Sequence, residues 1–197
     1  MDWRVLYNPL AVYGKGKGLL AALIVIIILT GAAMWGGVHL DGAFDLHVSE
    51  VRPSTGLIIL ESLVDWISLG IFLFAASRVF GGNGGIMQHL AGAGLARFPY
   101  IIFALLFSVQ SPFGQAMLKA VKVSKSEIII NPQLMNTPLV IFGTVIAAGL
   151  FVWALTILGF NHYQTSRLSI GKAVASFVIG IAFAEALSKL ILWAVIR

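Results

Sequence analysis

Long apolar runs, separated by short polar segments, dominate this sequence and restrict it to a membrane fold. A helix that spans a bilayer needs about 20 consecutive, mostly apolar residues. Four runs meet that length, over residues 18–40, 56–80, 137–160 and 171–196. A fifth run, 97–120, is interrupted by Pro112, which predicts a kinked span. We therefore expect residues 1–197 to form a single all-α integral membrane domain with five transmembrane helices.

The composition agrees with a membrane protein and excludes several kinds of chemistry. Hydrophobic residues make up 59% of the chain and charged residues only 11%, whereas soluble domains contain about 25% charged residues. The absence of cysteine excludes disulfides, thiolate metal sites and cysteine nucleophiles. The net charge of +5 comes from basic residues scattered near the predicted helix ends. This distribution indicates membrane topology, with the lipid bilayer as partner, and not nucleic-acid binding.

Five spans place the two termini on opposite sides of the membrane. Lys and Arg are enriched in cytoplasmic segments, so their positions predict the orientation. With the N-terminus inside, the inner segments hold Arg4, Lys15, Lys17, Arg78, Arg97, Arg167 and Lys172, and the outer segments hold Arg52, Lys119, Lys122, Lys125 and Arg197. This small excess predicts a cytoplasmic N-terminus and a C-terminus outside.

Two segments outside the spans are expected to form short interfacial helices. Residues 1–13 carry aromatic and leucine side chains at helical spacing, and Pro9, with Asn8 as its cap, is suited to begin a helix. Residues 85–96 follow the glycine cluster "GGNGG" and form the second such segment. Amphipathic segments of this kind lie in the plane of the membrane interface.

The two outer loops have a strand-like pattern. In "AFDLHVS" (43–49) apolar and polar residues alternate, and "VKVSKSEIII" (121–130) alternates in part. Such alternation is typical of strands. Because both segments fall on the same side of the membrane, we expect them to pair with each other as a small two-stranded extramembrane sheet.

Charged residues inside two of the predicted spans form the most informative pattern. Glu61 and Asp65 are one turn apart on the second span, about 7 and 13 Å from its outer end. Lys189 and Glu185 lie about 9 and 15 Å from the outer end of the last span. If these antiparallel helices touch, Glu61 is level with Lys189 and Asp65 with Glu185. Charges at such depth usually face a partner or a cavity.

Two interpretations of this group stay open. In the first, it is a structural network in which Lys189 neutralises an acid and another carboxyl stays protonated. In the second, Asp65 and Glu185 share a proton or chelate a cation. A ridge of small residues every four positions on the same helix favours close packing, within the chain or as a homodimer seam; the ridge is Ser176, Gly180, Ala184 and Ser188.

The outer loop "HLDGAFDLHVSE" gathers nitrogen and oxygen ligands. His39, Asp41, Asp45 and His47 are suitable for a divalent metal, although their spacing matches no standard zinc signature. A solvated polar loop is the alternative. The glycine-rich "GKGKG" and "GGNGG" lack the frame of a phosphate-binding loop.

The second half of the chain resembles the Yip domain family. "GNGGIMQHLAGAGLARFPYII" (82–102) looks like that family's glycine-rich segment, short helix and Pro-opened span. "FVWALTILGFNHYQTSRLSIGKAVASFVIG" (151–180) looks like its last two spans, with "GKA" opening the final helix. The resemblance implies five spans and an inner N-terminus. Its eukaryotic members are implicated in vesicle trafficking and contact prenylated Rab-type GTPases. The short segment of 17 residues before the first span suggests a minimal, prokaryotic member in the plasma membrane.

The sequence therefore predicts a non-enzymatic membrane protein without a cofactor. The resemblance implies an interaction or membrane-organising role, with a protein partner or a second copy of the chain. The alternative is a small transporter or channel-like protein with a carboxylate site for a cation or proton. A third hypothesis is a membrane-bound, metal-dependent enzyme that uses the outer loop.

Overall fold

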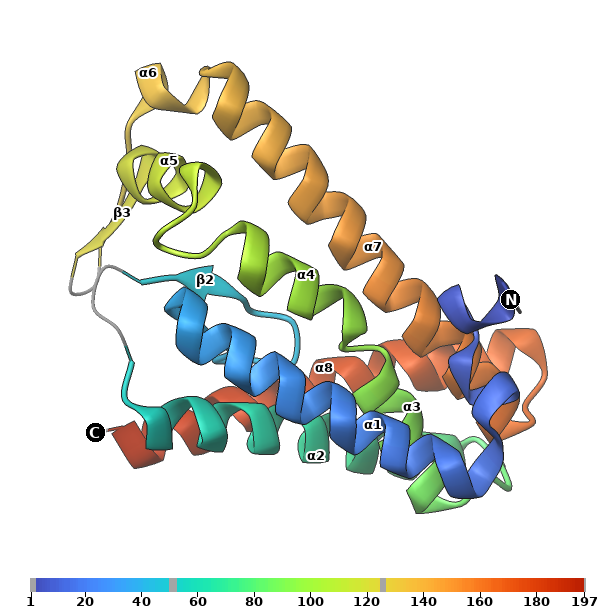
Figure 1. Cartoon of the computed structure of the whole chain (residues 1–197). Coiled ribbons are helices and arrows are strands. Elements are labelled where there is room, and N and C mark those ends of the chain that lie inside the picture. The colour runs from blue at the N-terminus through green and yellow to red at the C-terminus, as the bar shows by residue number, and fades with distance from the viewer. Residues whose placement is uncertain (1–2, 50–52, 125–126, 197) are drawn as a thin grey trace.

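The computed structural model describes residues 3–49, 53–124 and 127–196 and is mostly helical. The order of elements is η1 (Trp3–Leu6), α1 (Pro9–Gly36), β1 (Val38–His39), β2 (His47–Val48), α2 (Thr55–Val79), α3 (Ile86–Leu95), α4 (Phe98–Leu106), α5 (Pro112–Ala120), β3 (Val121–Ser124), β4 (Glu127–Ile130), α6 (Pro132–Met135), α7 (Pro138–Ser166) and α8 (Ile170–Ile196). Figure 1 shows the two ends of the chain at opposite ends of the helix bundle.

The prediction of five membrane-length helices is confirmed for the described residues. The five candidate spans are Gly16–Gly36, Thr55–Val79, Ile86–Leu106, Pro138–Ser166 and Ile170–Val195. Four of them agree with the predicted runs to within a few residues. The outer surface of these helices carries many large apolar side chains, which suit contact with lipid, and most of the interior is apolar as well. The polar side chains within the spans are mostly buried inside the bundle.

The N-terminal segment begins as its sequence predicts. Pro9 is the first residue of α1, and the Asn8 side chain caps the helix by accepting a hydrogen bond from the Ala11 N–H. At Gly14 the backbone has φ 69° and leaves the helical conformation. Residues 9–13 are thereby set off by a kink from the membrane-length part of α1. Trp3, in the preceding 3₁₀ turn η1, is exposed.

The third span was placed wrongly, because it is Ile86–Leu106 and not 97–120. Residues 85–96, predicted to be interfacial, form α3, the first half of that span. The small residues Ala91–Gly94 and Ala96 keep its hydropathy low, yet all of them are buried. Pro99 lies in the first turn of α4, so the span is broken between α3 and α4. Pro112 does not kink a span; it opens the separate helix α5, capped by Ser111.

Helices α2 and α8 run antiparallel and form the most extensive helix–helix contact in the molecule (Figure 1). The predicted small-residue ridge of α8 is buried, and Gly180 packs directly on α2, where an added Cβ would lie 3.0 Å from a Leu73 methyl group. This confirms the expectation that the second and last spans touch, and it assigns the ridge to packing within the chain.

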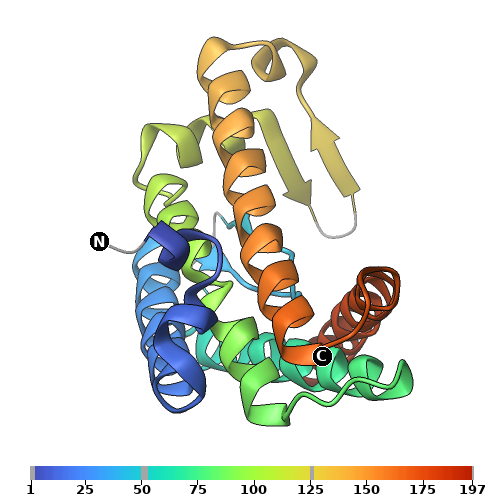
Figure 2. The same ribbon diagram turned by 90° about the vertical axis from the view of Figure 1, so that its right-hand side faces the viewer.

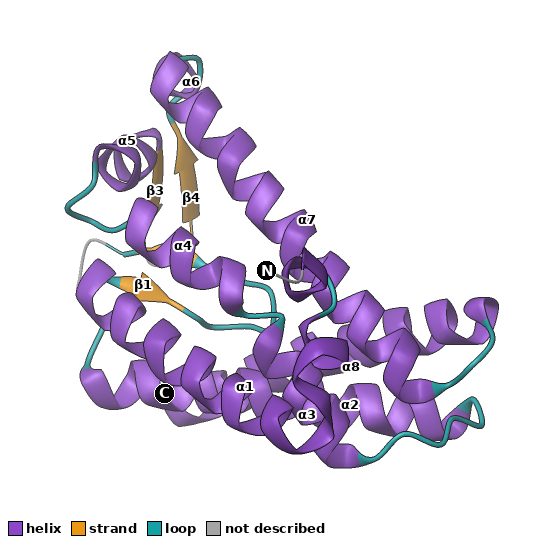
Figure 3. Cartoon of the chain, turned by 45° about the vertical axis from the view of Figure 1, so that its right-hand side comes forward, coloured by secondary structure: helices purple, strands orange, loops and turns teal. Residues whose placement is uncertain are grey.

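The two strand-like loops form two separate hairpins, so their predicted pairing with each other is wrong. β1 pairs with β2, with His39 opposite His47, and β3 pairs with β4, with Val121 opposite Ile130 (Figure 3). Each strand finds its partner a few residues away, and closing so short a loop costs less chain entropy than pairing two loops that are far apart in the sequence.

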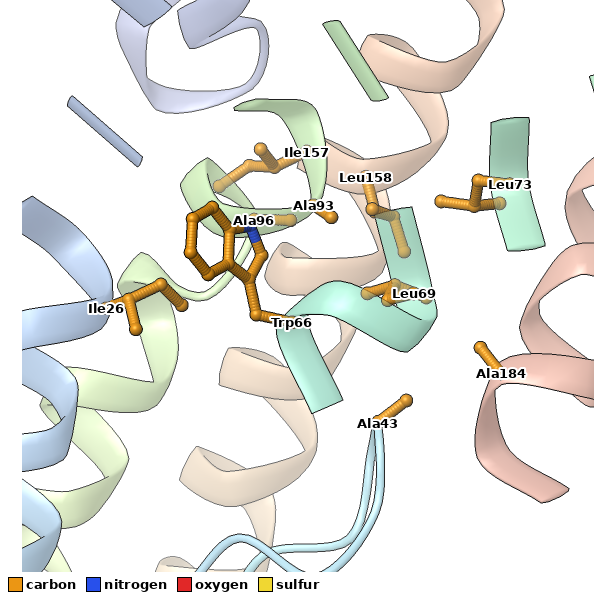
Figure 4. Packing of buried hydrophobic residues seen from close by; sticks show 10 residues of the cluster. All are labelled: Ile26, Ala43, Trp66, Leu69, Leu73, Ala93, Ala96, Ile157, Leu158 and Ala184. Carbon is orange, nitrogen blue, oxygen red and sulfur yellow. The ribbon is translucent and has the colours of Figure 1, made fainter. Parts of the chain in front are cut away.

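The hydrophobic core lies where α2, α3, α7 and α8 meet. Figure 4 shows Trp66 and Leu69 of α2 packed with Leu158 of α7 and Ala93 of α3. The indole N–H of Trp66 donates to the Leu90 carbonyl at 2.8 Å, which ties α2 to α3. Farther along its length α7 diverges from α2 and α8, and its N-terminal half stands beside α5 and the β3–β4 hairpin (Figures 1 and 2).

Candidate functional site

The β1–β2 hairpin inserts its tip, residues 40–46, into one end of the bundle. Leu40 and Ala43 are fully buried, and Ala43 joins the core cluster of Trp66 and Leu69. Gly42 permits this close approach, because a Cβ at this position would lie 2.5 Å from Glu185 Oε1. The loop between the first two spans is therefore part of the interior and not a solvated connection.

Glu61 holds the first half of the hairpin. Its side chain is completely buried, its Oε2 accepts the Leu40 N–H at 3.0 Å, and its Oε1 lies 2.8 Å from His39 Nδ1. Both carboxylate oxygens thus have a direct partner. Hydrogen bonds to a charged group contribute about 1.5–3 kcal/mol each, so Glu61 stabilises the position of the hairpin within the bundle.

Glu185 and Lys189 of α8 hold the other half of the hairpin. Glu185 Oε2 accepts the Phe44 N–H at 3.0 Å, and its Oε1 lies 3.1 Å from Lys189 Nζ. Lys189 Nζ also lies 2.8 Å from Asp45 Oδ2. Lys189 and Glu61, which were expected to lie at the same depth, do not contact each other. The hairpin supplies the partners of both, since Glu61 is bonded by His39 and Leu40, and Lys189 is paired with Asp45.

Asp65, one turn deeper than Glu61, has a different environment. It is completely buried, and within the described residues neither of its oxygens has a hydrogen-bond partner. Its nearest opposite charge is Arg97, whose Nη1 lies 3.8 Å from Oδ2. That separation is an ion pair but is too long for a hydrogen bond. The guanidinium also lies 5.7 Å from the centroid of the Tyr100 ring.

Arg97 was missed as a member of this group by the sequence analysis, which placed it in an inner segment. It is only 2% exposed and sits at the break between α3 and α4. Its Nη2 and the Tyr100 hydroxyl are buried without a hydrogen-bond partner in the described residues. The available signal was that Arg97 is the only charge between Ile86 and Leu106, in a run long enough to span a membrane.

Three of the four predicted metal-ligating residues come together at the mouth of the hairpin. One ligand atom each of Asp41, Asp45 and His47 lies within 4.8 Å of the others. His39 stacks on His47 at 5.1 Å between ring centroids, but its Nδ1 is engaged by Glu61. The ammonium group of Lys189 occupies one Asp45 oxygen. The cluster is therefore already balanced by an internal cation.

The close approach of His47 and Asp41 shifts the pKa values of both. The Asp41 carboxylate, whose Oδ1 lies 3.2 Å from His47 Nδ1, raises the pKa of His47 above its ordinary value, against the opposing effect of burial. Burial alone would raise the pKa of Asp41, but the neighbouring His47 outweighs it and the pKa of Asp41 is lowered. His47 thus gains affinity for a proton at the entrance to the charged interior.

Acid exceeds permanent positive charge across the whole group. Five carboxylates, those of Asp41, Asp45, Glu61, Asp65 and Glu185, face two permanent cations, Lys189 and Arg97, and two imidazoles, His39 and His47. Even with both imidazoles protonated, one negative charge is left over. A group of this composition attracts protons or small cations into the bundle.

The four ridge residues, which are on the same helix as Glu185 and Lys189, do not line this charged group as a set. Ala184 belongs to the hydrophobic core cluster, and the Ser188 hydroxyl donates to the carbonyl of Glu185 at 3.2 Å. Ser176, at the opposite end of α8, hydrogen-bonds His162.

The fold and the buried charges define the class of protein. Five apolar helices around an interior that holds ionised side chains fit a multi-pass integral membrane protein. No protein-family model, curated protein or solved structure matches the chain. The resemblance to the Yip domain family stays a prediction.

Proposed function

We propose that this protein is a small transporter or channel-like protein that binds a proton or a small cation at Asp65. The observation that carries the proposal is the contrast in hydrogen bonding. Glu61 and Glu185 are engaged by backbone N–H groups and by neighbouring side chains, whereas both oxygens of Asp65, which is as deeply buried as Glu61, lack a hydrogen-bond partner in the described residues. A buried acceptor without a partner costs about 1–3 kcal/mol, and more when charged, a cost that binding of a cation or proton would offset.

The broken third span supports this proposal. Discontinuous membrane helices are typical of ion and substrate sites, since their free ends and interrupted backbone line the site. Here the break carries Arg97, which faces Asp65. Protonation of Asp65 would cancel its attraction to Arg97, so a proton entering the site changes the pairing at the joint between α3 and α4.

The test is an ion-flux measurement in liposomes. The wild-type protein is reconstituted into vesicles that enclose a dye sensitive to H⁺, Na⁺ or K⁺, and a gradient of the matching ion is applied in each case. We expect one of these ions to move and Asp65→Asn to reduce its flux at least about tenfold. Because Asp65→Asn leaves Arg97 unpaired, Asp65→Asn/Arg97→Gln is measured beside it, and the melting temperature of each variant in detergent reports folding. Wild-type flux that persists in both folded variants would contradict the proposal.

A second candidate is the interaction or membrane-organising role implied by the resemblance to the Yip domain family. It is favoured by an apolar groove of about 570 Å³ between α1, α4 and α7, lined among others by Leu6, Tyr13, Phe98 and Trp153. The same liposomes distinguish the two candidates. A membrane-organising protein would move no ion and would change vesicle size or curvature, measured by electron microscopy against protein-free vesicles.

A further inference from the structure

A second buried polar group lies at the opposite end of the bundle from the hairpin and takes no part in the proposed function. It consists of His89 on α3 and of Asn161 and His162 on α7, all at most 3% exposed. The two imidazole rings are 5.6 Å apart between centroids and inclined by 64°. Each of these side chains has one buried atom without a hydrogen-bond partner in the described residues. The three atoms are His89 Nε2, His162 Nδ1 and Asn161 Oδ1.

The hydrogen bonds on the other side of each ring fix which nitrogen carries the proton. His89 Nδ1 lies 3.0 Å from the Gly85 carbonyl, which only accepts, so Nδ1 is protonated and Nε2 carries a lone pair. Ser176 donates its hydroxyl proton to the Ala173 carbonyl and must therefore accept from His162 Nε2, 2.8 Å away. His162 Nδ1 is consequently a lone pair as well.

Asn161 adds a third acceptor of the same kind. Its amide Nδ2 donates to the Gly92 carbonyl at 3.3 Å, which leaves Oδ1 as the free atom. Gly92 allows this contact, since a Cβ there would lie 3.0 Å from Asn161 Cβ. All three side chains line one small cavity of about 10 Å³, closed by Leu73, Ala93 and Leu158 among others.

We propose that His89 Nε2, His162 Nδ1 and Asn161 Oδ1 bind a late first-row transition-metal ion such as Zn²⁺, because imidazole nitrogen is a common ligand of these ions. The three side chains that carry these free acceptors line one cavity, which suits one water-sized occupant. A water molecule donates only two hydrogen bonds, whereas a metal ion accepts all three lone pairs. Metal-bound histidines almost always donate their other ring N–H to a carbonyl or a similar acceptor, which is the arrangement of both rings here.

The site also has a route of entry. His162 lines a second, larger groove of about 470 Å³ between α7 and α8, together with Phe160, Tyr163 and Phe177. A metal held by three protein ligands keeps its fourth position for water or an anion, and His162 is shared by the lining of this groove and of the small cavity. The proposal does not depend on ion flux at Asp65.

The experiment uses the full-length protein in detergent, freed of metal by chelation. Zn²⁺ binding is measured by isothermal titration calorimetry, and Co²⁺ binding by its visible absorption. We expect one ion per chain and a loss of affinity of at least about tenfold in His89→Gln and in His162→Gln. Ser176→Ala, which removes only the acceptor behind His162, should weaken binding about 10–100-fold. The control is His47→Gln, which removes the imidazole of the hairpin cluster and should leave binding unchanged.

X-ray absorption on the Zn²⁺-loaded wild-type protein gives a readout that needs no variant. We expect two imidazole ligands at about 2.0–2.1 Å, whereas the hairpin cluster offers only His47 with two carboxylates. Three outcomes would overturn the proposal. They are the absence of stoichiometric binding, binding that folded His89→Gln and His162→Gln retain, and binding that disappears in His47→Gln.

Discussion

Glu61 and Asp65 both carry a carboxyl group, lie one turn apart on one helix and are equally inaccessible to solvent, yet they differ in their hydrogen-bond partners. Glu61 accepts a backbone N–H and faces His39 at hydrogen-bond distance. Asp65 faces only Arg97, at 3.8 Å. The comparison teaches that two acids at neighbouring depths on one helix can have different surroundings. The fold supplies hydrogen-bond partners for both oxygens of Glu61 and for neither oxygen of Asp65, which is why we propose Asp65 as the ion-binding acid.

The hairpin explains why the two acids differ. It brings main-chain N–H groups and His39 to Glu61 and Glu185, whereas no hairpin group in the described residues hydrogen-bonds Asp65. The hairpin seat, defined by Glu61, Glu185 and the tip 40–46, is thus closed by direct hydrogen bonds. The Asp65–Arg97 pair is held by charge alone. Each of the following changes tests one side of this contrast.

The largest effect on stability is expected from separating the Asp65–Arg97 pair. Arg97→Met removes the cation and leaves a buried, unpaired carboxylate, which should cost about 3–5 kcal/mol in the free energy of unfolding. Replacing both members, in Asp65→Leu/Arg97→Met, should recover most of that loss, because a buried ion pair exchanged for apolar groups is often neutral or stabilising. Unfolding in detergent measures both. A double variant no more stable than Arg97→Met would show that the two residues are not paired.

A smaller loss is expected at the hairpin seat. Glu61→Ala leaves the Leu40 N–H buried without its acceptor and should cost about 2–3 kcal/mol. Amide hydrogen exchange at Leu40 should become faster, while exchange in α3 stays slow. Lys189→Ala is the matched comparison, since its ammonium is half exposed and such ion pairs contribute about 0–1 kcal/mol. Equal losses in the two variants would contradict the distinction between a buried anchor and a surface pair.

The smallest effect is expected from the pH dependence of His47. Because its pKa is raised in the folded protein, protonated His47 stabilises the fold. This contribution is fully present below the ordinary histidine value of about 6.5 and is lost as pH rises through the folded pKa. The wild type should therefore exceed His47→Gln in melting temperature at pH 5.5, and the difference should disappear at alkaline pH. A difference that grows with pH would mean that the sign of the shift is wrong.

Most of the helical framework could be predicted from the sequence, because a span of about 20 apolar residues is a local property. Four of five spans were predicted in this way. The third span was misplaced because its small, tightly packed residues 91–94 are not strongly hydropathic, and because the apolar residues that precede Pro112 extend the hydropathic run beyond the end of the span. Close packing, not hydropathy, buries that helix.

The candidate site was predictable in its acids but not in their partners. Glu61, Asp65, Glu185 and Lys189 do lie at one end of the bundle, as their depths along two antiparallel helices indicated. Which of them pair depends on where a loop of some ten residues folds back, and no periodicity encodes that. Arg97, His89 and His162 were missed for the same reason. A single polar residue in an apolar run has no spacing pattern, and only the fold reveals what it faces.

The most direct test of the contrast between the two acids is ion flux through Asp65→Asn and Glu61→Gln in the same liposome preparation. Both changes replace a buried carboxylate by an amide of the same shape, one turn apart. The glutamine keeps an oxygen for the Leu40 N–H and a second group for His39, whereas the asparagine removes the free carboxylate. We predict that Asp65→Asn loses the flux of the wild type and that Glu61→Gln keeps it. Loss in both variants, or retention in both, would contradict the assignment of Asp65 as the ion-binding acid.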